Sequence, residues 1–304
     1  MSRIQDILGK AERDGMVRRT RGLSEELGAP RALNPVPPLS GDSVTGRSNP
    51  GPNNASSRLG SNVAVAPFIA PELPPDRTFE LDSHLVAALA PTSLAAEQYR
   101  SLRTRIKRVE GNRSMRTIVV TSPSKGDGKS LTAANLALTM GQELQQRILL
   151  VDADLRRPTI HRLFGFGDGP GLTDVLMGGV ELDAVLVDLP EYHLTVLPAG
   201  TLPSHPAEML GSSAMRRVLD TLRTQFDRVL IDMPPVAPLA DLHIVAPQVD
   251  GVLMIVRAGM TSRPAIERAL SGLDATKVLG LVFNESGGDA SRKAEYEGYG
   301  YIAG

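Results

Sequence analysis

The chain has 304 residues, 41% of them hydrophobic, no cysteine and a formal net charge of −1. The absence of cysteine excludes a disulfide framework and a thiolate metal site, and the near-zero charge gives no electrostatic footprint for nucleic acid. No apolar run reaches the roughly 18 residues that a membrane-spanning helix needs. We therefore expect a cytoplasmic protein without a direct membrane span or a nucleic-acid partner.

The first part of the chain differs in composition from the rest. Residues 1–20 carry the pattern of a short amphipathic helix, whose apolar face is formed by Ile4, Ile7, Leu8 and Ala11. Residues 21–89 are rich in Pro, Gly, Ser and Asn, which predicts a disordered linker. The helix could dock on its own domain or bind a partner at the end of this linker, and the sequence leaves both open.

Apolar runs alternate with helical patterns over residues 90–285. The strand-like runs read MRTIVVTS, RILLVDAD, HLTVLPAG, DRVLIDMPP, GVLMIVRAG and VLGLVFN. Continuous apolar strands that alternate with helices indicate a parallel sheet covered on both faces. The sequence therefore predicts an α/β domain over residues 90–285, followed by a flexible tail at residues 286–304.

A glycine-bearing loop, SPSKGDGKS, joins the first strand to an apolar helix. Gly126 and Gly128 would let backbone N–H groups converge on phosphate oxygens at the start of that helix. In a P-loop, Lys129 would reach the β- and γ-phosphates and Ser130 would bind Mg²⁺. The general pattern has glycine where this chain has Pro123, and a glycine-rich turn that merely starts a helix is the alternative.

Three acidic residues close two later strands. Asp152 and Asp154 end the run ILLVDAD, and their spacing of two can turn both toward one site. Asp232 ends the run VLID, as in a Walker B segment. Ligands of open α/β sheets bind at these strand ends, and Mg²⁺ takes oxygen ligands. We expect Ser130 and Asp232 to bind Mg²⁺, and Asp152 or Asp154 to hold a water of the metal or accept a proton. Strand-end capping is the alternative for any single acid.

These segments together resemble the bacterial tyrosine kinases (BY-kinases), P-loop proteins that phosphorylate their own C-terminal tyrosine cluster. The resemblance runs from about residue 90 to the end and includes EQYRSLRTRI, TSPSKGDGKS, ILLVDADLRRPTIHRLFG, LPAGTLPSHPAEML and LIDMPP. It implies a P-loop NTPase fold of the deviant Walker, ParA/MinD-like type, with ATP and Mg²⁺ as cofactors. It also implies that Lys129, Asp152 and Asp154 are catalytic and that Asp152 joins Ser130 and Asp232 in binding Mg²⁺.

The resemblance assigns a nucleotide site by position in the motifs. Its members are Ser124, Lys125, Gly126, Asp127, Gly128, Lys129, Ser130, Leu131 and Asn284. Lys125 and Asp127 replace a proline and a glutamate that are common in the family. Lys125 either contacts phosphate or points to water. Asn284 is expected to contact adenine, with a loop cap as the alternative.

Charged residues on two segments also receive expectations. The resemblance implies that Glu97, Arg100 and Arg103 contact neighbouring subunits in a ring-shaped homo-oligomer. In isolation the same spacing fits a solvated helix face with an ion pair. Arg156 and Arg157 would meet phosphate, an acid or a surface partner.

Three of the five tyrosines lie in the last ten residues, EYEGYGYIAG. Tyr296, Tyr299 and Tyr301 have no apolar periodicity around them, and the intervening glycines favour mobility. By resemblance they are the phosphoacceptors, modified by another subunit of the same protein. Each phosphate would add a charge of about −1.5 to −2.

The resemblance implies a non-specific protein-tyrosine autokinase with ATP hydrolysis that regulates exopolysaccharide or capsule synthesis or export. Many relatives carry a fused transmembrane activator. Here we expect a separate transmembrane polysaccharide co-polymerase, which would recruit the kinase to the inner face of the plasma membrane. A tyrosine phosphatase is the expected opposing partner. The N-terminal helix and linker, similar to those of exosortase-locus relatives, are expected to engage the activator.

Two alternatives belong to other functional classes. A ParA/MinD-like regulatory ATPase shares the sheet and P-loop but usually has a lysine five positions before the P-loop lysine, whereas Lys125 is four before Lys129. A nucleotide-dependent scaffold without useful catalysis would leave the tail unmodified. An iron–sulfur carrier of this superfamily needs cysteines and is excluded.

Overall fold

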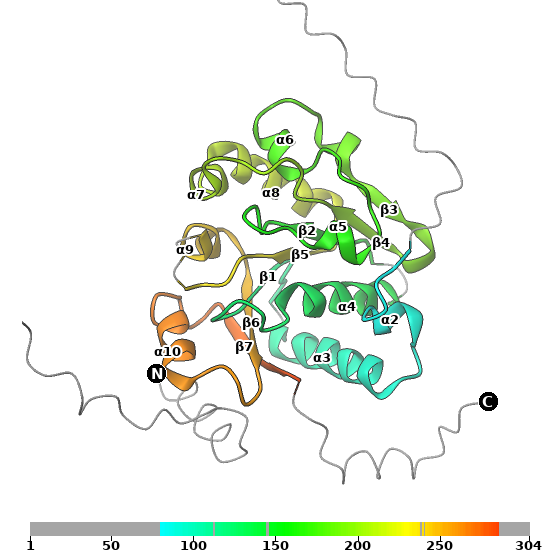
Figure 1. Ribbon diagram of the computed structural model, residues 1–304, viewed down its shortest axis with the longest axis vertical. Coiled ribbons are helices and arrows are strands. Elements are labelled where there is room, and N and C mark those ends of the chain that lie inside the picture. The colour runs from blue at the N-terminus through cyan, green and yellow to red at the C-terminus, as the bar shows by residue number, and fades with distance from the viewer. Residues whose placement is uncertain (1–79, 112, 144–145, 238, 240, 286–304) are drawn as a thin grey trace, which may run out of the picture. The chain divides into compact units, whose positions relative to one another are not determined.

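The computed structural model describes residues 80–285 except residues 112, 144–145, 238 and 240. The predicted N-terminal helix, most of the predicted linker and the tail with its three tyrosines lie outside these residues. The described residues form a central sheet between two layers of helices (Figure 1).

The sheet has seven strands in the order β3-β4-β2-β5-β1-β6-β7. They are β1 (Thr117–Thr121), β2 (Ile148–Asp152), β3 (Val187–Leu189), β4 (Leu194–Leu197), β5 (Arg228–Asp232), β6 (Gly251–Arg257) and β7 (Val278–Asn284). All neighbours are parallel except β3, which is antiparallel to β4. Every residue of β1, β2 and β5 is buried, as their continuous apolar runs require.

Helices cover both faces of this sheet. The α-helices are α2 (Val86–Leu89), α3 (Leu94–Glu110), α4 (Lys129–Gly141), α5 (Ile160–Leu163), α6 (Leu172–Leu176), α7 (Pro206–Leu210), α8 (Ser213–Gln225), α9 (Asp241–Val245) and α10 (Arg263–Ser271). Alternate residues of β1 serve the two layers: Ile118 and Val120 pack in the core with α4, and Val119 packs in the core with α8. The predicted parallel sheet with helices on both faces is confirmed.

The last residues of the predicted linker are folded. Leu85 and Ala87 are buried, and Val86–Leu89 forms α2. The amide of Asn135 on α4 holds this segment, because its Oδ1 accepts from the N–H of Ala87 and its Nδ2 donates to the carbonyl of His84, both at 3.0 Å. The expected boundary at residue 89 is therefore too late: the short apolar run HLVAAL packs on the domain, although the composition of the whole segment favours disorder.

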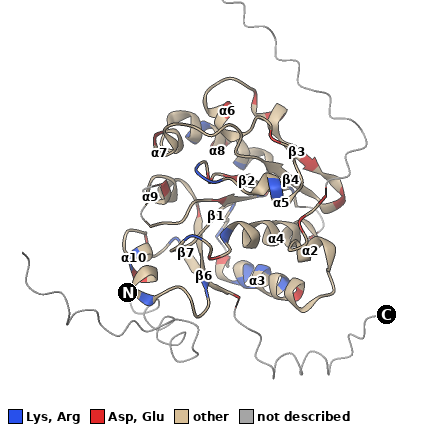
Figure 2. Ribbon diagram, viewed as in Figure 1, with Lys and Arg blue, Asp and Glu red and all other residues tan. Residues whose placement is uncertain are grey.

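Basic side chains gather along α3, as Figure 2 shows, and they are Arg100, Arg103, Arg105, Lys107 and Arg108. The helix begins at a serine cap, where the Oγ of Ser93 accepts from the N–H of Ala96.

None of the helices in the described ranges is long and apolar enough to cross a membrane.

Candidate functional site

The loop between β1 and α4 has the backbone of a P-loop. Gly126 and Gly128 adopt φ values of 85° and 89°, a left-handed conformation that glycine adopts without steric cost. Lys129 then begins α4, a helix of 13 residues. The first N–H groups of such a helix have no partner within it, and they favour an anion at this end.

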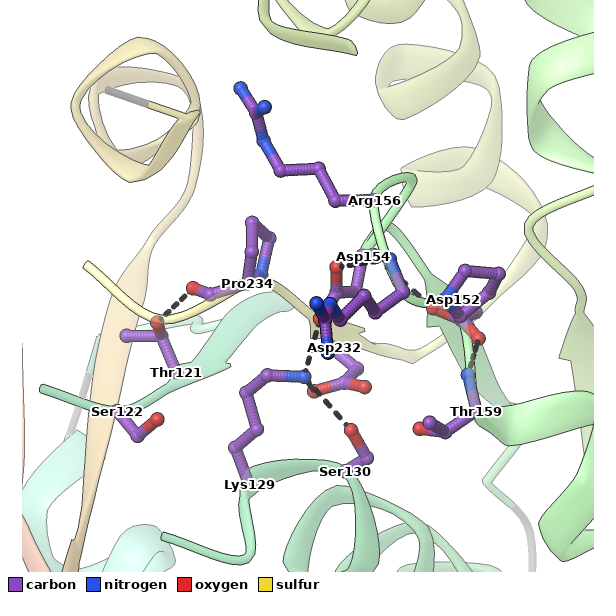
Figure 3. Close-up of polar contacts among 12 residues, drawn as sticks. Thr121, Ser122, Lys129, Ser130, Asp152, Asp154, Arg156, Thr159, Asp232 and Pro234 are labelled. Carbon is purple, nitrogen blue, oxygen red and sulfur yellow. Dashed lines mark hydrogen bonds and ion pairs between the residues drawn. The ribbon is translucent and has the colours of Figure 1, made fainter. Parts of the chain in front are cut away.

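Three strand ends meet at this loop. Asp152 of β2 lies directly opposite Asp232 of β5, which in turn lies opposite Val120 of β1. The Nζ of Lys129 is 2.8 Å from Oδ2 of Asp154 and 3.5 Å from Oδ1 of Asp232 (Figure 3). The structure therefore brings the P-loop lysine and the strand-end acids into one cluster.

The carboxylate of Asp152 is fixed by backbone donors. Its Oδ2 accepts from the N–H groups of Thr159 and Ile160, both at 3.0 Å, and its Oδ1 accepts from the N–H of Asp154 at 3.2 Å. Burial and the nearby charge of Asp232 raise the pKa of Asp152 to about 7. The backbone donors hold this carboxylate in place, and its raised pKa puts its protonation change near neutral pH.

Asp232 offers an unused oxygen to the site. Its side chain is fully buried, and its Oδ2 has no hydrogen-bond partner among the residues that the structure describes. Burial raises the pKa of Asp232 to about 6, although Lys129 opposes this effect. A buried carboxylate oxygen without a partner calls for a ligand, and a hard cation would be one.

The residues present fit magnesium. The hydroxyl of Ser130 lies within hydrogen-bonding distance of Asp232, and Asp152 places a second carboxylate on the neighbouring strand. Within the described part of the chain, no three His, Cys, Asp or Glu side chains form a ready metal cage. A site completed by a hydroxyl, phosphate oxygens and water suits Mg²⁺, which usually keeps several waters and substrate phosphates.

The carboxylate of Asp127 is hydrogen-bonded both within the P-loop and to a residue outside it. It is 4% exposed; its Oδ2 accepts from the N–H of Ser124 at 2.9 Å, and its Oδ1 accepts from the hydroxyl of Thr261 at 2.8 Å. Asn284 at the end of β7 donates from Nδ2 to the carbonyl of Asp127 at 3.0 Å. The predicted nucleotide residue Asn284 thus lies on the P-loop itself.

Sequence reasoning missed Thr261, because 134 positions separate it from its partner Asp127. Two predicted residues of the loop region are less enclosed. Lys125 is exposed, which leaves it free to meet either water or phosphate, and Leu131 is half-buried on α4.

An arginine pairs across the top of the acidic strands. Arg156 donates from Nε and Nη2 to the two carboxylate oxygens of Asp241 at 2.7 and 3.0 Å. Asp241 is buried at the start of α9. Arg156 therefore meets an acid, and it ties the loop after β2 to the segment after β5. Arg157 donates its backbone N–H to Asp154 at 3.0 Å.

The three residues expected at a subunit contact lie on α3. Glu97 and Arg100 form an ion pair within the helix, with the Nε of Arg100 2.7 Å from Oε2 of Glu97. Arg103 instead faces the end of α4, where its Nε is 3.0 Å from Oε1 of Glu143. Arg103 is thus used inside the subunit, and it does not belong to a purely solvated face.

Comparison with known proteins is consistent across sequence and structure. A sequence model of the ParA family, described as an NUBPL iron-transfer P-loop NTPase, matches residues 113–297. The chain is 35% identical over 227 residues to the tyrosine-protein kinase YwqD of Bacillus subtilis (strain 168), covering 74% of this chain and 94% of that protein. It is 32% identical over 221 residues to the tyrosine-protein kinase wzc of Salmonella typhi, covering 72% of this chain.

The chain spans only 30% of the length of the Salmonella typhi protein. Among solved structures, the kinase domain of the Escherichia coli tyrosine kinase ETK is similar, with a TM-score of 0.63 and 27% sequence identity. That similarity covers 69% of this chain and 82% of the other. The description of the ParA model mentions iron transfer, but this sequence has no cysteine whose thiolate could hold an iron–sulfur cluster.

Proposed function

The chain belongs to the bacterial tyrosine kinase family of P-loop proteins, and from this premise we propose that it is an ATP-dependent tyrosine autokinase. Its acceptors would be Tyr296, Tyr299 and Tyr301, modified in trans. The contact of Lys129 with both Asp154 and Asp232 carries the proposal, because it joins the phosphate loop to the acids of two strand ends. Phosphoryl transfer depends mainly on such positioning and charge neutralisation.

Each group has a part in this reaction. The loop N–H groups and Lys129 would hold the phosphates of ATP, with Ser130, Asp152 and Asp232 as ligands of Mg²⁺. When bound, the metal neutralises charge on the phosphates. Lys129 is itself a cation in this site, because the charges of Asp232 and Asp154 raise its pKa and outweigh the opposing effect of burial.

The transfer step balances without a further reactant. The tyrosine oxygen bonds to the γ-phosphorus, the bond between that phosphorus and the β-phosphate bridging oxygen breaks, and ADP leaves. The phenolic proton passes to a carboxylate at the end of β2, either Asp152 or Asp154. We favour Asp154 for this role because it is outside the proposed metal set. Its contact with Lys129 also places it beside the residue that would hold the phosphates.

The wider setting is proposed on the family alone. The kinase would regulate exopolysaccharide or capsule synthesis or export, activated by a transmembrane polysaccharide co-polymerase and opposed by a tyrosine phosphatase. A ring-shaped oligomer would use α3. Glu97 and Arg100 could exchange their mutual ion pair for contacts with a neighbour, whereas Arg103 would have to leave Glu143.

Mass spectrometry of the tail tests the proposal. The full chain is incubated with ATP and Mg²⁺, with and without the cytosolic segment of a candidate activator. Lys129→Ala and Asp152→Asn should abolish phosphate on all three tyrosines, whereas Arg147→Ala, at an exposed arginine outside the predicted site, should retain it. ATP hydrolysis with an unmodified tail, activator present, would instead support the ParA/MinD-like regulatory ATPase.

A further inference from the structure

The P-loop is gripped by two segments that lie far along the chain. Asp127 and its neighbour Gly128 contact Thr261, in the loop between β6 and α10, and Asn284, at the end of β7. We propose that Asp127, Thr261 and Asn284, here called the P-loop clamp, hold the loop in the shape that binds nucleotide, with Thr261 as a positioning residue. This inference rests on the proposed nucleotide binding.

The carboxylate of Asp127 organises the loop from inside. One oxygen accepts the N–H of Ser124, three residues earlier, and so closes the loop on itself. The other oxygen accepts the hydroxyl of Thr261. Both oxygens of this nearly buried group therefore have partners, as a buried charge requires. Removing either donor would leave part of a buried acceptor unsatisfied.

The hydroxyl of Thr261 is committed in both directions. It donates its one proton to Asp127, and it accepts the backbone N–H of Arg257 at 3.1 Å. The backbone N–H of Thr261 returns to the carbonyl of Arg257 at 3.0 Å. Thr261 is 4% exposed, so water has little access to replace these bonds. A hydroxyl at this position is thus a fixed link between β6 and the P-loop.

Asn284 closes the clamp against the next residue of the loop. A Cβ on Gly128 would overlap Nδ2 of Asn284, so a side chain at this position would push the asparagine amide away. The same Nδ2 donates to the carbonyl of Asp127. Because Lys129 follows directly and begins α4, the clamp fixes the backbone from which the phosphate-binding lysine extends.

The clamp acts before phosphate arrives. A loop already in its binding shape loses little conformational freedom when nucleotide binds, whereas a loop that samples other shapes binds in proportion to its competent fraction. Loss of the Thr261 hydroxyl should therefore weaken nucleotide binding although Thr261 is not among the predicted phosphate ligands. Coupling is reciprocal, so nucleotide should in turn stabilise the clamp.

Equilibrium titration of the full chain with a fluorescent ADP analogue in Mg²⁺ tests this. Thr261→Val removes the hydroxyl with little change in volume, and we expect affinity to fall roughly ten-fold, the effect of losing one hydrogen bond to a charged group. Thr261→Ser keeps the hydroxyl and should remain within about three-fold of wild type on the same reasoning. Thr195→Val is the matched control, because it removes a Thr–Asp hydrogen bond of 2.7 Å to Asp188 at the other edge of the sheet.

A double-mutant cycle separates the clamp from general destabilisation. If Thr261 acts through Asp127, then adding Thr261→Val to Asp127→Ala should weaken ADP binding no further. Circular dichroism checks that each variant folds. If Thr261→Val does not fold, the ADP affinities of Asp127→Asn and Thr261→Ser are compared instead. Wild-type affinity in Thr261→Val, or equal losses in the valine and serine variants, overturns the clamp while nucleotide binding stands. Wild-type protein that binds no ADP overturns both.

Discussion

The ammonium group of Lys129 lies 2.8 Å from a carboxylate oxygen of Asp154, a residue that follows a different strand. A second acid, Asp232, lies 3.5 Å from the same nitrogen. The P-loop lysine is therefore held by the protein's own acids. Phosphate would have to compete with these carboxylates, or share the lysine with them through a metal ion.

Lys129→Ala should destabilise the fold as well as abolish phosphorylation. Removing one partner of a buried ion pair costs about 3–5 kcal/mol, because the remaining charges stay buried and unpaired. Lys129 opposes the raised pKa values of Asp152 and Asp232, so without the lysine these two pKa values rise further in the folded state. The loss of stability should therefore be larger at pH 8 than at pH 6, where protonation relieves it. Urea unfolding at both pH values measures this. Equal losses at both would contradict it, and Lys125→Ala is the exposed control.

Asp152→Asn should become more favourable to the metal-free protein, relative to wild type, as the pH rises from 4 to 7. The asparagine amide has only one acceptor oxygen, so it loses a backbone hydrogen bond that Asp152 makes at every pH. The pKa of Asp152 is raised from 3.8 to about 7 in the folded state. A carboxyl with a raised folded pKa favours the folded state fully below pH 3.8, and this stability is lost as pH rises toward 7. The melting temperature of the asparagine variant, relative to that of the wild type, should therefore rise between pH 4 and pH 7 and then level off. A difference in melting temperature that is independent of pH would refute the assignment. Adding Mg²⁺ to the same melts should raise the melting temperature of the wild type more than that of the asparagine variant, because metal binding requires the ionised carboxylate.

Arg156→Ala should lower the free energy of unfolding by about 2–3 kcal/mol, because it leaves the buried carboxylate of Asp241 without its bidentate partner. Arg147→Ala is the matched control: it removes an Arg–Asp pair to Asp227 in which both side chains are largely exposed. The control should cost less than about 1 kcal/mol. Chemical denaturation of both variants decides the point, and similar costs would show that the Arg156 pair is only a surface contact.

Asn135→Leu should destabilise the domain by about 3 kcal/mol. The substitution leaves the N–H of Ala87 and the carbonyl of His84 without their side-chain partner. Asn135→Asp keeps an acceptor for Ala87 but turns a buried carboxylate oxygen toward the carbonyl of His84, so it should be no milder. Limited proteolysis should detect loosening of the segment before α3 in both variants. Resistance equal to wild type would show that the apolar contacts of Leu85 suffice to dock this segment.

Much of the fold follows from local pattern. Strands such as ILLVD are apolar without interruption because both faces are covered, and the P-loop is marked by glycines that need positive φ. Asp152 and Asp232 can be predicted as strand-end acids because parallel strands end at one edge. Their adjacency in register follows from the strand order, which places β2 beside β5.

The remainder depends on contacts between distant segments. Asp127 gives no sequence signal for its partner Thr261, since any buried threonine would look alike before the sheet is assembled. Arg103 is a second case, in which packing between helices decides the partner. Its spacing suggests a solvent-facing stripe, but α3 packs against α4 and brings it to Glu143. Tertiary packing decides such side chains, and helical periodicity alone does not.

The position of Asn284 sets a length of tether. The chain leaves β7 at a residue whose amide touches the P-loop, and Tyr296 follows twelve positions later (296 minus 284). At about 3.3–3.6 Å per residue, this stretch can span up to roughly 40 Å. A tether of this length would hold the tyrosine at an effective concentration on the order of millimolar near its own loop. Transfer in trans would then be a matter of approach direction rather than reach, and a phosphorylation rate per molecule that falls on dilution would be its signature.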